Sequence, residues 1–315
     1  MTGNTLGWVI VAFVLYLLMM IAIGAFYAKG NNNSEDYFLG GRKLNGFVAA
    51  LSAQASDMSG WLLMGLPGAI YLTGVGGDGW IAIGLFIGTT LNWLFIATKL
   101  RRYTIRANNS VTLPTYFENR FHDDKKVLMT VSSITIVVFF LVYCASALSA
   151  GGQLFESVFG IDYHVALTIG ALVVLVYTFL GGFTAVCVTD FIQGMLMLVG
   201  ILAVPLFAYH FLTGNGTTLA AGLEASGADS ANFLNLMKNG DGSNNIISVI
   251  SGLGWGLGYF GMPHILVRFM AVRDEKEMTK SKATAISWVA LSLGFAVFIG
   301  ILGSCLLYTS DAADD

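Results

Sequence analysis

The sequence predicts an all-α protein that crosses a membrane several times. Composition is the first observation: 56% of the 315 residues are hydrophobic and only 11% are charged, and the mean hydropathy is +0.72. A soluble domain of this length needs far more charge to cover its surface. The second observation is that apolar runs of about 20 residues recur along the chain. The third is that basic residues are distributed unequally among the connections between those runs.

Eight apolar runs are long enough for a helix to cross roughly 30 Å of hydrocarbon. In chain order, the expected spans are 6–28, 46–72, 79–98, 127–150, 164–182, 187–212, 246–270 and 283–304. The first run lacks the cationic segment and the small-residue cleavage site of a signal peptide. We therefore expect it to be retained as a span.

Basic residues occur in every second connection. They follow the first, third and seventh spans as Lys29, Arg42 and Lys43; then Lys99, Arg101, Arg102, Arg106, Arg120, Lys125 and Lys126; then Arg268, Arg273, Lys276, Lys280 and Lys282. The only other basic residue among the 16 is Lys238. Because basic connections of membrane proteins stay in the cytoplasm, we expect a multi-pass protein whose N-terminus lies outside.

Two connections contain signals for short helices. The connection 213–244 is polar and glycine-rich, and its segment "TLAAGLEASG" predicts one short helix. In "SVTLPTYFENRF", Pro114 lies two positions after a threonine and is expected to open another.

The second span contains an acidic residue. Asp57 lies in "LSAQASDMSGWLLMGLPGA", an apolar run that also holds Ser59, Gly60 and Pro67. A charged side chain at the centre of a bilayer costs about 2.5–3.5 kcal/mol on insertion scales, so it must face protein, water or a cation. A break in the helix would also free backbone carbonyls, and oxygen ligands of this kind suit a hard cation such as sodium. The alternative is that Asp57 only caps the second half of the helix.

The seventh span is interrupted as well. It reads "ISGLGWGLGYFGMPHILVRF", with glycines at positions 252, 254, 256, 258 and 261 before Pro263. Each glycine costs a helix about 1 kcal/mol relative to alanine, so the pattern indicates a bend or an unwound stretch. Aromatic and polar side chains around it suit a small organic ligand. The alternative is a glycine seam for close helix packing.

The two interruptions lie in spans of opposite direction, five spans apart. Interrupted helices in corresponding places of two oppositely oriented halves are typical of inverted-repeat secondary transporters, whose substrate binds near the middle of the membrane. On this interpretation, spans two to six form the first repeat, and spans seven and eight begin the second.

Five segments resemble a known family. They are "GGRKLNGFVAALSAQASDMSGWLLMGLPGAIY", "LPTYFENRF", "YCASALSAGGQLFESVFG", "YTFLGGFTAVCVTDFIQG" and "GWGLGYFGMPHILVRFMA". Residues from about 6 to 304 resemble the proline-transporting bacterial members of the sodium:solute symporter family. The resemblance implies a leucine-transporter-like inverted-repeat core, of which this chain holds an extra first helix, the first five-helix repeat and the start of the second. It also implies sodium-coupled uptake of L-proline across the bacterial cytoplasmic membrane by alternating access.

The same resemblance implies roles for individual residues. Backbone oxygens of Ala55 and Met58 would bind sodium, and Asp57 would be essential for sodium coupling. The residues beside the substrate would be Ser59, Gly60, Tyr143, Trp255, Tyr259 and Pro263. Met262 stands where a glutamine often precedes the proline of the seventh span.

Two further charged residues have a role implied by the resemblance. Asp190 in "VTDFIQG" resembles the acidic residue on the inward sodium route, and Arg42 in "GGRK" resembles a functional residue of the cytoplasmic side. Asp190 could equally be an N-terminal helix cap. Arg42 alone would be interpreted as a positive-inside anchor. His264 is interpreted as a helix-packing group rather than a proton relay.

No catalytic chemistry is expected. The sequence shows no nucleophile–base pair, metal cluster or phosphate loop, and Cys144, Cys187 and Cys305 form no motif. The run "GLGWGLG" lacks the strand–turn–helix context of a nucleotide loop. We expect no enzyme activity, no cofactor apart from sodium as coupling ion, no nucleic acid and no obligatory protein partner. Membrane lipid is the expected surrounding.

Three alternatives to proline symport stay open. The solute could be another one used by the family, such as pantothenate, a sugar or a carboxylate. The chain could be the membrane part of a transporter–kinase sensor. The coupling ion could be a proton.

The last residues of the chain depart from the family pattern. The segment 305–315, "CLLYTSDAADD", resembles a translated sequencing adapter and is excluded from the expected fold. The resemblance places the hydroxyl ligands that complete the sodium site in a ninth span. We therefore expect residues 1–315 alone to be inactive in transport.

Overall fold

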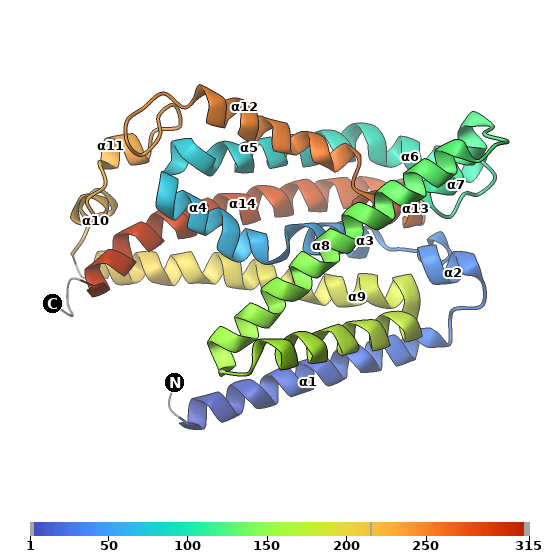
Figure 1. Ribbon diagram of the computed structural model, residues 1–315, viewed down its shortest axis with the longest axis horizontal. Coiled ribbons are helices and arrows are strands. Elements are labelled where there is room, and N and C mark those ends of the chain that lie inside the picture. Colours follow the sequence, from blue (N-terminus) through green and yellow to red (C-terminus); the bar gives the residue numbers. More distant parts are fainter. Residues whose placement is uncertain (1–2, 215, 312–315) are drawn as a thin grey trace. The chain divides into compact units, whose positions relative to one another are not determined.

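The computed structural model describes residues 3–214 and 216–311, and every regular element within these ranges is a helix (Figure 1). The chain forms two compact units. Unit 1 comprises Met1–Ala53, Ala97–Ile192 and Pro263–Ser281, and unit 2 comprises Gln54–Ile96, Gln193–Met262 and Lys282–Asp315.

Unit 1 contains long apolar helices and the short elements between them. Its elements are α1 (Gly3–Ala28), α2 (Ser34–Leu39), the 3₁₀ turn η1 (Gly40–Arg42), α6 (Thr98–Arg106), α7 (Leu113–Phe121), α8 (Val127–Phe159), α13 (Pro263–Ala271), and the first parts of α3 (Gly46–Gly60), α9 (Tyr163–Gly214) and α14 (Glu275–Asp311). Pro114 lies in the first turn of α7, and Thr112 and Thr115 form a reciprocal capping box there. This confirms the predicted start of a short helix.

Unit 2 contains the remaining parts of α3, α9 and α14. Its other elements are the π-helical turn η2 (Trp61–Gly65), α4 (Leu66–Thr73), α5 (Val75–Leu91), most of the π-helical turn η3 (Asn92–Ala97), α10 (Leu219–Ala225), α11 (Ser230–Phe233), α12 (Ile246–Trp255) and the 3₁₀ turn η4 (Gly256–Phe260). Helices α5 and α12 run side by side (Figure 1). The predicted helix in the polar connection is α10, and the Thr218 side chain caps it by accepting a bond from the Ala221 amide.

The polar connection is anchored by an apolar cluster in unit 2. Buried Leu223 of α10 and Phe233 of α11 pack with Leu212, Leu302 and Cys305. Cys305 opens the segment interpreted as an adapter sequence, yet its side chain is fully buried in this cluster, and α14 continues to Asp311. Residues 312–315 lie outside the described residues.

Five helices within the described residues are long and apolar enough to cross a membrane. They are Gly7–Ala28, Val75–Arg106, Val127–Phe159, Tyr163–Gly214 and Glu275–Leu306. A sixth span results if Ile246–Phe260 and Pro263–Ala271, which meet at 45°, are counted together. The expected second span is divided among α3, η2 and α4. The eight ranges inferred from the sequence stay a prediction.

Helix α9 covers two of the predicted spans. It has 52 residues, which would extend over about 78 Å if straight. At Gly182 the backbone leaves helical geometry with φ 61° and ψ −159°. A φ of this sign favours glycine, so the sequence allows the helix to bend there. The bend lies at the end of the predicted span 164–182.

Candidate functional site

The second span is broken at Ser59. This residue has φ 23° and ψ −164° inside α3, a conformation that non-glycine residues rarely adopt. Its hydroxyl oxygen accepts a bond from the Trp61 amide at 3.3 Å, which is the geometry of an N-cap for the helix that follows. The π-helical turn η2 comes next, and Pro67 lies in the first turn of α4. The predicted interruption is therefore present.

The seventh span is broken over a longer stretch. Helix α12 ends at Trp255, η4 covers Gly256–Phe260, and α13 begins at Pro263. Proline at the first position of a helix has no amide hydrogen to satisfy, so it suits this restart.

Within unit 2, the two broken spans meet through Asp57. The hydroxyl of Tyr259 in η4 donates a hydrogen bond to Asp57 Oδ2 at 2.5 Å, and Tyr259 is only 2% exposed. The rings of Trp61 and Trp255 stack with centroids 5.7 Å apart. Of the residues predicted as substrate contacts, Tyr259 thus contacts the predicted sodium residue, and Trp255 stacks on the ring of Trp61, four positions after that residue. Trp61 was not singled out from the sequence, although it follows "SDMSG" directly.

Asn92 holds the second break in place. Its side-chain amide donates to the Tyr259 carbonyl at 2.8 Å, and the side chain is 1% exposed. Its Oδ1 is buried with no hydrogen-bond partner among the described residues. Sequence reasoning missed Asn92. The available signal was an amide within the apolar run 79–98.

The glycine pattern of the seventh span has two functions. Gly252 and Gly256 pack against α5: a Cβ at Gly256 would lie 2.2 Å from the Gly84 carbonyl oxygen, and one at Gly88 would lie 2.2 Å from the Gly256 carbonyl oxygen. Real side chains never approach this closely. A seam for close packing and a break at η4 are therefore both present, so the two explanations left open by the sequence are complementary.

The other predicted sodium and substrate residues are divided between the units. Ala55, Met58 and Gly60 lie in the last part of α3, which belongs to unit 2 and leads into η2. The Met58 side chain is 1% exposed. Tyr143 and Pro263 lie in unit 1. The Tyr143 ring stacks on His264 with centroids 5.6 Å apart, and Phe140 also packs on that imidazole. These ring contacts agree with the interpretation of His264 as a packing residue.

Asp190 does not cap a helix. It lies within α9, past the bend at Gly182, and it is 8% exposed. The Arg268 guanidinium forms an ion pair with Asp190 Oδ2 at 2.9 Å, and the Ser52 hydroxyl donates to the same oxygen at 2.7 Å. The helix-cap alternative is therefore wrong. Arg268 also differs from the expectation, since it was counted among the basic residues of a cytoplasmic connection but is 6% exposed.

Arg42 is buried in unit 1, where its guanidinium links several chain segments, so it is not an exposed basic residue at the membrane surface. It donates to the Ser110 and Met270 carbonyls at 2.8 Å each and to Asn109 Oδ1 at 2.9 Å. Glu35 lies 3.4 Å away as its ion-pair partner. Burial lowers the pKa of Arg42, and Glu35 opposes that shift. An arginine that ties several chain segments together positions the start of α3, so it can influence the second span without touching a ligand.

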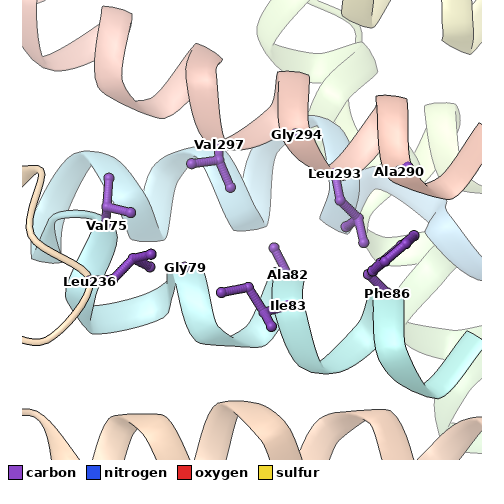
Figure 2. A pocket seen from close by; sticks show the side chains of 10 residues that line it. All are labelled: Val75, Gly79, Ala82, Ile83, Phe86, Leu236, Ala290, Leu293, Gly294 and Val297. Carbon is purple, nitrogen blue, oxygen red and sulfur yellow. The ribbon is translucent and has the colours of Figure 1, made fainter.

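Two cavities, one in each unit, are mainly apolar. In unit 2, a cavity of about 420 Å³ lies between α5 and α14, with side chains such as Ile83, Phe86 and Leu293 around it (Figure 2). No predicted site residue lines it. In unit 1, Pro263 lines a cavity of about 360 Å³ together with residues of α7 and α8.

The family model described as the sodium:solute symporter family matches residues 37–312. Three curated relatives named sodium/proline symporter are each 44% identical to the chain. The Escherichia coli K12 and Staphylococcus aureus JH9 proteins match over 93% of this chain, covering 57% and 56% of their own lengths. The Haemophilus influenzae protein matches over 96% of this chain and 59% of its own length. The chain therefore spans less than two thirds of these relatives.

The fold is similar to that of a solved structure, a substrate-bound outward-open state of a Na⁺-coupled sialic acid symporter. The TM-score is 0.76 at 20% sequence identity, over 94% of this chain and 61% of the other. At that identity the likeness concerns the fold alone. It confirms the predicted class, an all-α membrane protein with a leucine-transporter-like core. Because the family model matches most of its length, the chain belongs to the sodium:solute symporter family.

Proposed function

We propose that this chain takes part in sodium-coupled uptake of L-proline across the bacterial cytoplasmic membrane. One observation carries the proposal: the Tyr259 hydroxyl at the break of the seventh span binds the Asp57 carboxylate at the break of the second. The relatives named sodium/proline symporter support proline as the solute. The N-terminus is proposed to lie outside, because the basic connections then face the cytoplasm.

Sodium is proposed to bind at the break of the second span. A helix that ends leaves the carbonyls of its last turn without partners inside the helix, and the turn before Ser59 contains Ala55 and Met58. These backbone oxygens and the Asp57 carboxylate provide the hard oxygen ligands that sodium prefers. Sodium is the transported ion, and no resident cofactor is proposed.

Proline is proposed to bind beside the sodium ion. Its carboxylate would face backbone amides near Ser59 and Gly60, since amides at a helix start attract anions. Its apolar ring would pack on Trp255 and Tyr259. Tyr143 and Pro263 are further proposed contacts with the substrate, carried over from the family motifs.

Transport is proposed to proceed by alternating access, with Asp190 on the inward sodium route and Arg42 supporting the cytoplasmic side. One sodium carried with zwitterionic proline moves one net charge, which is worth about 2.3 kcal/mol per 100 mV. Because a tenfold concentration ratio corresponds to about 1.4 kcal/mol, this charge alone supports roughly fifty-fold accumulation.

A chimera tests the proposal. Residues 1–304 replace the matching part of the Escherichia coli relative, and uptake of labelled L-proline is measured in cells that lack proline transport. We expect uptake in sodium medium and its loss in potassium medium. Asp57→Asn should abolish uptake. Asp78→Asn is the matched control, because Asp78 also accepts one hydroxyl bond, from Thr73, at the start of α5. Uptake that persists with Asp57→Asn would contradict the proposal.

The same assay separates the alternatives. An excess of unlabelled pantothenate, sugar or carboxylate should not compete with proline, and a pH gradient without sodium should not drive uptake. The expectation that residues 1–315 alone are inactive stays a prediction. It is tested by proline uptake in cells that produce only this chain.

A further inference from the structure

Three polar side chains form a closed ring in the interior of unit 1. Arg268 donates to Asp190 Oδ2 from Nη2 at 2.9 Å and to the Ser52 hydroxyl oxygen from Nε at 3.0 Å. Ser52 donates in turn to Asp190 Oδ2 at 2.7 Å. Ser52 is fully buried, and the other two residues are at most 8% exposed. The ring thus contains one cation and one anion away from water.

The guanidinium is held on several sides. Its Nη1 donates to the His264 carbonyl at 2.6 Å, and its carbon lies 5.4 Å from the centre of the Phe183 ring. Guanidinium groups stay protonated in proteins, so Arg268 supplies a fixed positive charge to Asp190. A buried carboxylate requires such a partner, since an uncompensated buried charge is strongly destabilising.

The ring connects parts of both interrupted spans. Ser52 precedes the break in α3, Arg268 follows the break at η4, and Asp190 lies in α9 after its bend. Within unit 1, the ring therefore joins one half of each interrupted span to a third helix.

We propose that Arg268 is a tethered cation that occupies the place of sodium at Asp190, and that sodium on its inward route displaces it. This inference rests on the proposed function, in which Asp190 lies on that route. One buried carboxylate needs one monovalent cation, so an exchange of guanidinium for sodium keeps the site neutral. Arg268 leaves Ser52 when it leaves Asp190, and the contact between α3 and α13 opens in the same event. Arg268 is thus a positioning residue that couples ion passage to helix separation.

A cysteine next to the ring provides a reporter. Cys187 lies one turn before Asp190 in α9, is fully buried, and is within electrostatic range of Arg268 and Asp190. The chain has three cysteines. Replacing Cys144 and Cys305 by serine leaves Cys187 as the only thiol, and its alkylation by N-ethylmaleimide then reports opening of the ring.

The experiment uses the full 315-residue chain in lipid nanodiscs without proline. The alkylation rate is measured in sodium and in potassium at equal ionic strength. With Arg268 present, we expect slow alkylation in potassium and alkylation at least threefold faster in sodium, because sodium that displaces Arg268 opens the ring. Arg268→Gln should raise the rate in potassium at least tenfold, and sodium should then slow it at least fivefold, because sodium takes the vacated place at Asp190. The double variant Arg268→Gln/Asp190→Asn should react fast in both salts.

Two further variants control for charge and for folding. Arg102→Gln removes an exposed arginine that pairs with Glu275, and it should behave like the parent. Arg268→Lys keeps the charge, so sodium should still speed its alkylation, and it should react several-fold faster than the parent in potassium because the bond to Ser52 is lost. If Arg268→Gln aggregates, the alkylation of Arg268→Lys tests the proposal in its place. A parent whose alkylation rate sodium leaves unchanged, a sodium effect that persists in the double variant, or parent-like reactivity of both Arg268 variants would overturn the proposal.

The outcome is independent of proline uptake. If the chimera fails to transport proline while sodium protects Cys187 in Arg268→Gln, the proposed function is wrong and the cation site stands. If the chimera transports but sodium never protects Cys187, the tethered cation is wrong and the proposed function stands.

Discussion

At the scale of single residues, the site depends on Tyr259, which is hydrogen-bonded through both its side chain and its backbone. Its hydroxyl donates to Asp57, and its carbonyl accepts from Asn92. The bond from Asn92 ties η4 to the start of η3, so together with the packing of η4 on α5 it helps to set the direction in which the Tyr259 ring points. A residue that touches no ligand can therefore decide where a ligand residue lies.

Replacing Asn92 by leucine tests this role. The change leaves the buried Tyr259 carbonyl without its side-chain donor, which costs about 1–3 kcal/mol. We expect a lower thermal unfolding midpoint of the chain and a higher proline concentration for half-maximal uptake by the chimera. Thr90→Val is the matched control, because the buried Thr90 hydroxyl has no hydrogen-bond partner among the described residues. Equal effects of the two changes would contradict the role of Asn92.

The sequence revealed some site residues and hid others for physical reasons. Asp57 was found because an acid inside an apolar run is costly and must have a partner. Arg268 was assigned to a connection because it lies near the end of a span, where basic residues usually face water. Its partner Asp190 is 78 positions away, and no local pattern reports that contact. Asn92 was missed because a single amide in an apolar run has many possible partners.

At the scale of elements, the glycines of the seventh span differ in what a substitution would do to stability. A Cβ at Gly256 would clash with the backbone of α5, whereas one at Gly254 would meet open space. Gly256→Ala should destabilise the chain by about 1–3 kcal/mol through overpacking. Gly254→Ala should be neutral or stabilising by up to about 1 kcal/mol, since alanine favours the helix. Thermal unfolding in detergent measures both, and a Gly256→Ala chain as stable as Gly254→Ala would contradict the seam.

The start of α14 makes stability depend on pH. Asp274 Oδ1 accepts a bond from the Glu277 amide at 2.9 Å, and this amide together with Arg273 lowers the pKa of Asp274. A carboxyl whose pKa is lowered by folding stabilises the folded state fully above its ordinary value of 3.8, and that contribution disappears as the pH falls through the lower folded-state pKa.

Asp274→Asn provides the comparison, because asparagine keeps the cap but does not titrate. Unfolding midpoints measured from pH 7 to pH 3 should fall more steeply for the parent than for Asp274→Asn. Parallel curves would show that the cap contributes nothing through its charge.

Elements were predictable where local chemistry decides them. The capping threonines of α7 and α10 and the break at Ser59 follow from short sequence signals. The extent of α9 does not, since the sequence gives two apolar runs and the bend at Gly182 joins them without a loop. The 3₁₀ form of η4 was not predictable either. It depends on packing against α5, and the sequence of the seventh span alone does not report that contact.

At the scale of the whole molecule, the fold class followed from composition and periodicity, because the membrane requires every backbone group to be satisfied within helices. The family followed from motifs that cover most of the chain. The grouping of segments into two units could not be predicted from the sequence, because unit 1 and unit 2 each combine segments from three separate parts of the chain. Such contacts depend on packing between distant segments.

The bond between Tyr259 and Asp57 joins the two interrupted spans at the place proposed to bind a cation and an amino acid. Tyr259→Phe removes only the hydroxyl that joins them, and Tyr209→Phe, an exposed tyrosine of α9, is the control. The most direct measurement is proline uptake by the chimera as a function of sodium and of proline concentration. Because a hydrogen bond to a charged group contributes about 1.5–3 kcal/mol, we predict that Tyr259→Phe raises the half-saturating concentrations of both sodium and proline about tenfold or more, with Tyr209→Phe unchanged. A Tyr259→Phe chimera whose sodium dependence matches the parent would contradict the account.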